Sequence, residues 1–305
     1  MVYLTSMIKG LLITQGVEVV WAFRIPFFIF IAIGTLCAFI ASFSIKEKDY
    51  VVPKSCSFSM LKSMKETFRY RNFAVMAVGF LVMWISFGFF NASLVYDITV
   101  LLALPDIWMT IVPGISIVVT LIFYPIVGKI AKTFGKKIPL CVAMGIYALL
   151  YFGVYLCGVF NIAESPTLLK IVVAVIIGVC NGIPLAATNT IPPAAIADCA
   201  QVDTIASGNH REGMFMAVKN FCMKVTQSLV LLFAPIVIVI GASDGTTPTV
   251  FGVAIAALIA SIAALVTIFI YAFYDDRQVK ETIEGHLKET VIQESEKENE
   301  ETSLV

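Results

Sequence analysis

Seven long apolar stretches dominate the chain. They run over residues 24–45, 73–95, 107–127, 138–160, 168–196, 214–241 and 250–273. Each reaches the roughly 20 residues that an α-helix needs to cross the hydrocarbon core of a bilayer at about 1.5 Å per residue. Strands of a membrane β-barrel would be about ten residues long and would alternate polar with apolar positions, and these stretches do neither. The pattern therefore predicts an all-α, polytopic membrane protein with seven transmembrane helices.

The polar segments beside these stretches divide the chain into regions. Residues 1–23, which charged side chains interrupt, are expected to be the end of a helix and an external loop, and 24–45 the first transmembrane helix. A cytoplasmic central loop, 46–72, separates this helix from a six-helix bundle over 73–273. Within the loop, a helix lying in the membrane interface and a solvated basic linker both fit the pattern. The acidic residues 274–305 are predicted to be a disordered cytoplasmic tail.

The distribution of Lys and Arg predicts the orientation in the membrane. Segment 46–72 holds seven of these residues and segment 128–138 holds four. The alternate connections hold none; they are 96–106, 161–167 and 242–249. Because Lys and Arg accumulate in cytoplasmic loops, the basic segments and the C-terminus are expected in the cytoplasm. An odd number of spans then places the N-terminus outside, in a multi-pass protein of the plasma membrane.

Composition excludes several other classes of protein. Apolar residues make up 59% of the chain and charged residues only 14%, whereas a soluble domain carries about 25% charged residues. The formal net charge is zero, so no basic field favours a nucleic-acid partner. The seven cysteines are scattered and the two histidines lie far apart, so no metal site is predicted. Because no phosphate-binding glycine loop, zinc-protease motif or nucleophile elbow is present, we expect neither an enzyme nor a bound cofactor.

An ionisable side chain deep in a membrane span is costly and indicates function by default. In the stretch 214–241, Lys224 lies about ten residues, or roughly 15 Å, from the expected cytoplasmic end. Asn220 and Gln227 lie about one turn before and after Lys224 and share its helical face. We expect this face to line a water-filled cavity that takes part in substrate binding or coupling. The alternative is that Asn220 and Gln227 hold neighbouring helices together.

Acidic side chains show the opposite pattern. No span carries an Asp or Glu near its centre. Asp97 and Asp198 are expected near span ends, where water is close. The pattern therefore predicts no carboxylate in the middle of the membrane.

Prolines interrupt the stretch 168–196 at 181–184 and again at 191–193. Proline removes a backbone donor and bends a helix, so we expect a broken helix whose freed backbone faces protein or a water-filled cavity. Asn181, Thr188 and Asn189 are expected to share one polar stripe beside a substrate site. A kink that only improves packing is the alternative interpretation.

The stretch 73–95 contains a second polar and aromatic face. Trp84 and Asn91 are two helical turns apart and lie on the same side. An aromatic ring beside an amide is a good platform for a sugar ring. Packing in the core or at the membrane interface is an equally good explanation.

One connection resembles a loop of the major facilitator superfamily. That loop motif runs glycine, a spacer, an acidic residue, then glycine and two basic residues. In this chain the matching residues are Gly128, Gly135, Lys136 and Lys137. Lys132 stands where the motif has its acidic residue. The resemblance implies a twelve-helix transporter fold in which this segment is a cytoplasmic gating loop.

A second connection is similar to that of the glycoside–pentoside–hexuronide:cation symporters, the melibiose permease group. Its matching residues, also in a cytoplasmic gating loop, are Asp198, Gly208, Arg211, Glu212 and Gly213. Lys224 corresponds to the lysine in this family's eleventh helix that is tied to sugar and cation coupling.

The resemblance implies that the seven spans are helices 6–12, so that the N-terminal half, helices 1–5, is a missing partner. In this family the carboxylates that bind Na⁺ or H⁺ lie in that half. The implied function is cation-coupled symport of a sugar or glycoside, with this chain as the C-terminal part, unable to transport alone. The alternatives are a carrier of lysophospholipid or another solute within the same superfamily, and a non-transporting membrane partner or truncated product.

Overall fold

The structure is a computed structural model. It describes residues 18–44, 70–208, 212–242 and 247–286, together with three isolated positions nearer the N-terminus and in the last connection. These residues belong to two compact units, Met1–Phe58 and Ser59–Val305. Each unit is treated by itself.

The first unit contains helix α2 (Val19–Ser44), which corresponds to the first predicted span. Most of its apolar side chains are exposed, and Phe43 is 82% exposed. A helix with apolar side chains around its whole circumference is stable in lipid or against other helices. The predicted interface helix within 46–72 falls on residues that the structure does not describe.

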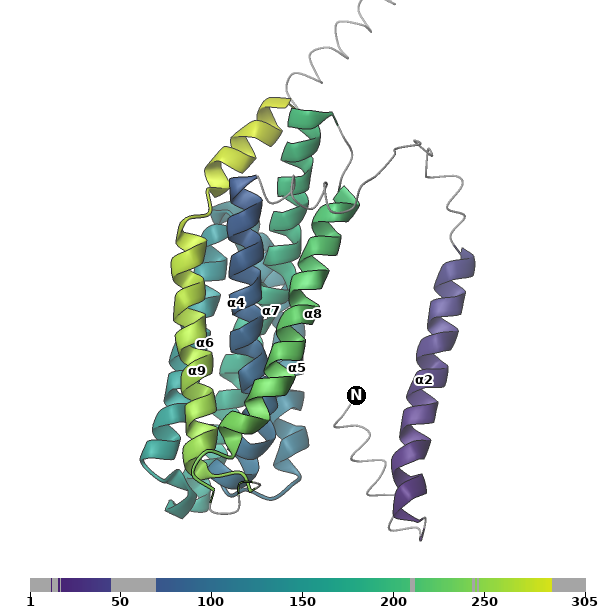
Figure 1. The fold of residues 1–305 in the computed structure, drawn as a ribbon. Helices are drawn as coiled ribbons and strands as arrows, with labels where there is room; N and C mark the ends of the chain where they lie inside the picture. The colour runs from purple at the N-terminus through teal and green to yellow at the C-terminus, as the bar shows by residue number, and fades with distance from the viewer. Residues whose placement is uncertain are drawn as a thin grey trace, which may run out of the picture. The chain divides into compact units, whose positions relative to one another are not determined.

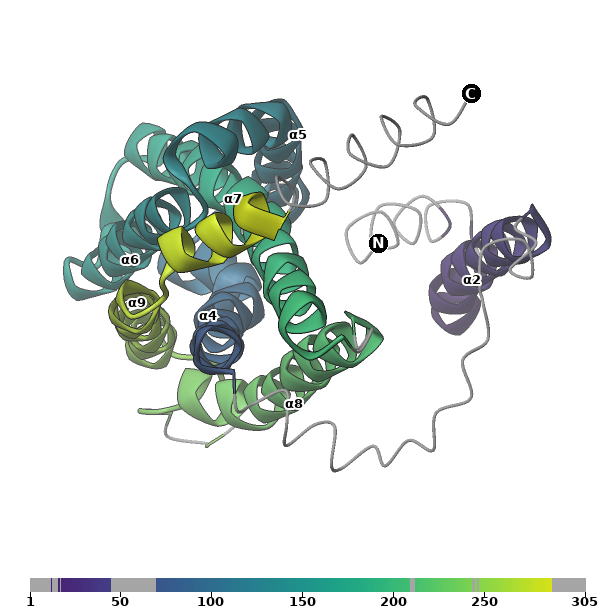
Figure 2. The same cartoon turned by 90° about the horizontal axis from the view of Figure 1, so that it is seen from above.

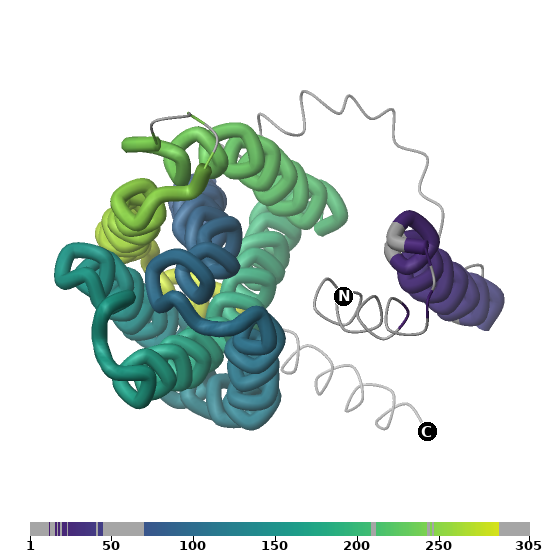
Figure 3. Tube along the Cα trace, turned by 90° about the horizontal axis from the view of Figure 1, so that it is seen from below, coloured from purple at the N-terminus to yellow at the C-terminus, as the bar shows by residue number. Residues whose placement is uncertain are grey.

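The second unit is a bundle of six long helices that stand side by side (Figure 1). They are α4 (Arg71–Tyr96), α5 (Trp108–Phe134), α6 (Lys137–Val159), α7 (Thr167–Ser207), α8 (Glu212–Ile238) and α9 (Val250–Ala272). Two short turns join them at one end of the bundle, the π-helical η2 (Asp97–Leu101) and the 3-10 helix η3 (Ile162–Glu164) (Figure 3). We call the other end, where α5 meets α6 at Lys136 and Lys137, the basic end.

The predicted fold class is confirmed. Seven helices among the described residues, α2 and the six of the bundle, are long and apolar enough to cross a membrane. No strand occurs in the described part of the chain. Each predicted span overlaps one of these helices because the length of an apolar run reflects the thickness of a bilayer.

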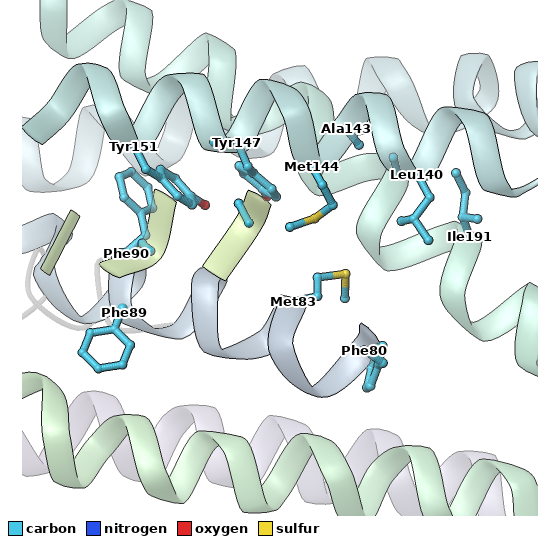
Figure 4. Close-up of a cluster of buried hydrophobic side chains, with 14 of the residues drawn as sticks. Phe80, Met83, Phe89, Phe90, Leu140, Ala143, Met144, Tyr147, Tyr151 and Ile191 are labelled. Atoms are coloured by element: carbon cyan, nitrogen blue, oxygen red, sulfur yellow. The ribbon is translucent and has the colours of Figure 1, made fainter. Parts of the chain in front are cut away.

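The core of the bundle lies where α4 packs against α6 and α9. Figure 4 shows Phe90, Tyr147 and Tyr151 between α4 and α6. The Phe90 and Tyr151 rings stack with centroids 4.2 Å apart, and those of Tyr147 and Tyr151 are 5.1 Å apart. Stacked aromatic pairs stabilise by about 0.5–1.5 kcal/mol beyond the burial of their area. This aromatic column therefore fixes α6 against α4.

A second seam joins α5 to α7 through small residues. Ser116 Oγ donates a hydrogen bond to Gly178 O at 2.8 Å, and Thr120 Oγ1 donates to Gly182 O at 3.0 Å. A Cβ placed on Gly182 would lie 2.6 Å from Ser116 O and 2.7 Å from the Val119 Cβ. Glycines spaced in this way allow two membrane helices to approach closely and to exchange hydrogen bonds. The seam is thus specified by glycines on α7 and hydroxyls on α5.

Helix α7 corrects the prediction of a broken helix. It is one continuous helix of 41 residues with Pro184, Pro192 and Pro193 inside it. Serine and threonine hydroxyls from α5 bond to carbonyls of α7 close to Pro184. These bonds hold α7 against α5 on both sides of Pro184, although the carbonyl that Pro184 leaves without a helical donor is that of Cys180. At about 1.5 Å per residue α7 is roughly 60 Å long, so it extends well beyond a bilayer core.

The C-terminal segment corrects a second prediction. Residues 276–286, expected to be part of a disordered tail, form a helix that lies across the basic end (Figure 2). Val279 is completely buried, and Tyr274, just before the helix, is 2% exposed. Asn72 Nδ2 donates to Asp275 O and to Gln278 Oε1, each at 3.4 Å. Burial of Val279 explains why an acidic segment is helical here, while residues 287–305 lie outside the described part.

Candidate functional site

A small cavity inside the bundle collects side chains from α4, α6 and α7. It is lined by Met83, Trp84, Phe87, Tyr147, Leu185, Thr188 and Asn189. Trp84 Nε1 is buried and has no hydrogen-bond partner among the described residues. Thr188 is buried and Asn189 is exposed, so an indole donor, a hydroxyl and an amide converge where the cavity meets the surface. The cavity measures only about 10 Å³, which is room for one water molecule at most, so in this state the polar groups meet without leaving space for a larger ligand.

The structure separates Asn181 from Thr188, although both were predicted to lie on one stripe. Asn181 is buried at the α5–α7 seam, where its Nδ2 donates to Ser116 Oγ at 3.3 Å. Thr188 Oγ1 donates to Pro184 O in its own helix at 3.0 Å and lines the cavity. The surroundings of Asn181 therefore favour the helix-packing role, whereas Thr188 lies beside the small cavity with its hydroxyl bonded within its own helix.

The two candidates on α4 also differ. Trp84 lines the cavity, whereas Asn91 is not among its lining residues. Asn91 is exposed, and its Nδ2 donates to Phe87 O of the same helix at 2.8 Å. The shared helical face was expected, but only Trp84 meets α6 and α7 there.

The polar face of α8, formed by Asn220, Lys224 and Gln227, lies on the outside of the bundle. Asn220 and Lys224 are exposed and Gln227 is half-buried. Lys224 Nζ donates to Gln227 Oε1 at 3.3 Å. No carboxylate of the described residues forms an ion pair with Lys224. The buried side of α8 carries Val218, Cys222, Thr226 and Val230 instead.

Lys219 lies one turn closer to the basic end and has a different environment. Its Nζ is 5.8 Å from the centre of the Phe80 ring on α4. A cation over an aromatic face is stabilised by about 0.5–1 kcal/mol at exposed sites. Lys219 thus has a partner within the bundle that Lys224 does not have.

At the basic end, Lys136 connects three segments. Its ammonium forms an ion pair with Asp198 of α7 and donates to Ala194 O at 2.8 Å. Its backbone N–H donates to Asp276 Oδ2 at 2.8 Å. Gly135, which precedes Lys136, ends α5 with φ +81°, a conformation that favours glycine. The start of α6, α7 and helix 276–286 are therefore joined through one residue.

Other residues of the predicted gating loops are distributed around this end. Lys137 Nζ donates to Ala272 O at 2.5 Å, at the end of α9. Gly208 caps α7 in the left-handed region with φ +67°, and the exposed Glu212 and Gly213 begin α8. Gly128 lies inside α5, and Arg211 lies outside the described residues.

Sequence reasoning missed two acidic residues. Asp276 was assigned to a disordered tail, whose composition gives no signal of a contact with Lys136. Asp97 was expected close to water, and this expectation is wrong because Asp97 is completely buried. The helix continues past residue 95 as η2, which carries the carboxyl into the protein.

Tyr274 lies beside the Lys136 cluster, outside the predicted spans. Burial raises its pKa above the usual value, and the nearby Cys199, Asp276 and Asp198 act in the same direction. The hydroxyl therefore stays neutral and is available only as a hydrogen-bonding group.

Long apolar helices, with polar groups gathered at a helix seam, a small cavity, one outer face and the ends of the bundle, define the class of polytopic helical membrane proteins. Within this class, the family model described as MFS/sugar transport protein matches residues 3–276, and the chain belongs to this family of the major facilitator superfamily. No curated protein matches the chain in sequence.

Proposed function

We propose that this chain is the C-terminal part of a cation-coupled symporter of a sugar or glycoside, driven by Na⁺ or H⁺. The observation that carries the proposal is Lys224, an exposed ammonium near the midpoint of α8. The proposal follows the glycoside–pentoside–hexuronide pattern, with the six bundle helices as helices 7–12. Family membership supports transport as the general activity.

The environment of Lys224 supports the need for a further component. The exposed apolar residues Phe221, Val225 and Leu229 flank it on α8. A charged side chain near the centre of a bilayer costs about 3 kcal/mol or more unless water or an opposite charge compensates it. Within the described residues only Gln227 contacts the ammonium. A second bundle, with a carboxylate and a water-filled cavity, supplies the missing compensation.

The outer faces of α5 and α8 support the same arrangement. Apolar side chains are exposed along both helices, among them Ile117 and Leu121 on α5 and Leu231 and Leu232 on α8. Apolar faces on both sides of a polar stripe suit a second helical unit that packs around a central cavity. In this arrangement Asn220, Lys224 and Gln227 face the substrate pathway.

The side chains around Trp84 suit a hydroxylated ring as the substrate once α4, α6 and α7 move apart, because the closed space of about 10 Å³ holds no more than a water molecule. An indole ring provides an apolar face, while Thr188 and Asn189 provide a hydroxyl and an amide. A carrier of lysophospholipid is the second candidate. It is favoured by an apolar groove of about 450 Å³ between α6 and α7, which Leu150 and Gly153 help to line.

The basic end is proposed as the cytoplasmic gate, in agreement with the predicted orientation. The Lys136 and Asp198 side chains are 20% and 28% exposed. Partly exposed ion pairs contribute only about 0–1 kcal/mol, so this one can break and re-form as the transporter changes state. Asp276 would then connect the gate to the C-terminal helix 276–286.

Uptake into proteoliposomes tests the proposal. The purified chain alone should show no accumulation of labelled sugar or glycoside under an imposed Na⁺ or H⁺ gradient. The chain produced together with the sequence encoded immediately upstream of it should accumulate substrate. Lysophospholipid uptake in place of sugar uptake would favour the second candidate. Gradient-driven sugar uptake by the chain alone would show that no partner bundle is needed, and absence of any uptake by the assembled form would favour a non-transporting membrane protein.

A further inference from the structure

Asp97 is a buried carboxyl group that belongs neither to the loops at the basic end nor to the polar face of α8. It begins η2, at the end of the bundle opposite Lys136, and is 0% exposed. Ser93 Oγ lies 3.2 Å from Asp97 Oδ2 and 3.1 Å from Phe90 O, so its one hydrogen is shared between the carboxyl and that carbonyl. Asp97 Oδ1 is buried and has no hydrogen-bond partner among the described residues. One carboxyl oxygen is therefore held in place while the other is unoccupied by any donor of the described chain.

The groups that surround Asp97 provide no compensating positive charge. On α6 the titratable groups facing it are Tyr151 and Cys157, both neutral hydrogen-bonding groups in their usual state. The titratable residue of α9, Tyr271, lies at the far end of that helix, and η3 carries the acidic Glu164. The first half of α5 carries no titratable residue. Within the described residues, no Lys, Arg or His acts on this carboxyl.

A proton is the cation that fits this site. A buried carboxylate without a partner is strongly unfavourable, whereas the neutral acid removes the charge and turns one oxygen into a donor. Hard metal cations take about six or more oxygen ligands, but the side-chain oxygens shown here are those of Asp97 and Ser93. We propose that Asp97, supported by Ser93, is a reversible proton-binding site at the end of α4. The step is addition of one proton to the carboxylate to form the neutral acid.

The backbone after Asp97 offers a way for protons to reach the site. In place of a regular helical turn, Leu102 N donates to Asp97 O at 2.9 Å and Leu104 N donates to Ile98 O at 3.0 Å. Ala103 has φ +48°, which is uncommon for a residue other than glycine. π-Helical turns of this kind occur frequently at functional sites. Movement of the segment from Asp97 to Leu104 would expose the carboxyl to water. The same movement would take three buried side chains out of the core, those of Ile98, Leu101 and Leu102.

Infrared spectroscopy of the full chain in lipid tests this proposal independently of transport. A protonated carboxyl gives a C=O stretching band that is separate from the carboxylate bands and that shifts in D₂O. We expect this band at neutral pH in the natural chain and its complete loss in Asp97→Asn. The matched control is Asp106→Asn, because Asp106 is exposed nine residues later, and it should retain the band. Ser93→Ala should keep the band but shift its frequency, because the hydrogen bond to Oδ2 is lost.

Isotope labelling keeps the test decisive if Asp97→Asn fails to fold. Aspartate labelled with ¹³C at the side-chain carboxyl, incorporated into the natural chain, should shift the same band. A band that persists in Asp97→Asn or ignores aspartate labelling would overturn the proposal, as would a natural chain without such a band. Replacing Na⁺ with K⁺ at constant pH should leave the band unchanged. Loss of the band on adding Na⁺ would instead identify a metal-cation site and contradict the proposal.

Discussion

The α5–α7 seam and the outer face of α8 both carry polar side chains, but within the described part of the chain only those of the seam form hydrogen bonds to a neighbouring helix. At the seam, Ser116 and Thr120 find carbonyls of the neighbouring helix at 2.8 and 3.0 Å. On α8, Lys224 contacts only Gln227 of its own helix among the described residues. Polar groups within a membrane need partners in both cases. The seam therefore satisfies its hydroxyl groups within the bundle, although Asn181 Oδ1 has no partner among the described residues. For the face of α8, by contrast, we propose that a partner from outside the bundle completes it.

Among the substitutions that test this comparison, Gly182→Ala in the seam is expected to change stability most. The added Cβ would lie 2.6 Å from Ser116 O and 2.7 Å from the Val119 Cβ, so α5 and α7 must separate. We expect a loss of about 1–3 kcal/mol of unfolding free energy, as for other overpacked sites. Thermal or denaturant unfolding of the purified chain measures it. Gly128→Ala on α5 is the matched control, because a Cβ there meets nothing within 4 Å; equal stability of the two variants would remove the seam from the account.

A smaller effect is expected from the hydrogen bond between the same helices. Thr120→Val keeps the shape of the side chain but removes the donor to Gly182 O. Interhelical hydrogen bonds in membranes contribute about 0.6 kcal/mol on average, so we expect a destabilisation of that size. Thr267→Val is the control, since Thr267 is also buried and its hydroxyl bonds to Ala263 O of its own helix, whereas Thr120 Oγ1 lies 2.7 Å from Ser116 O of its own helix and 3.0 Å from Gly182 O across the seam. The unfolding free energy of each variant is compared with that of the natural chain. If Thr120→Val lowers it no more than Thr267→Val does, close packing alone holds the seam.

The apolar periodicity of the chain predicted the helical spans, but it could not predict their full lengths. Hydropathy reports how long a segment lies in lipid, and helix α7 continues through polar residues such as Asp198 and Asp203 to Ser207. For the same reason η2 was missed beyond residue 95. Helical structure extends where backbone bonding and packing allow it, whether or not the side chains are apolar.

The site residues show the same limit. A helical wheel places Asn181 and Thr188 on one stripe, but α7 packs against α5 at Asn181 and approaches α4 and α6 at Thr188. Lys136 and Asp198 were both singled out from loop motifs, and only the fold shows that they pair. Asp276 had no motif at all. One-dimensional patterns identify polar residues within the membrane, while the neighbouring helix decides what each residue contacts.

The measurement that tests the central claim most directly compares Lys224→Ala with Lys219→Ala in the form assembled with its upstream segment. Substrate uptake is measured with and without an ion gradient and normalised to the protein present in the membrane. If the outer face of α8 lines the pathway, Lys224→Ala abolishes coupled uptake while the amount of protein stays unchanged. Lys219→Ala reduces uptake less, because Lys219 lies closer to the end of α8 and its long side chain can reach the membrane interface. Near-normal coupled uptake by Lys224→Ala, or loss of that variant from the membrane, would contradict a direct role for this face in transport.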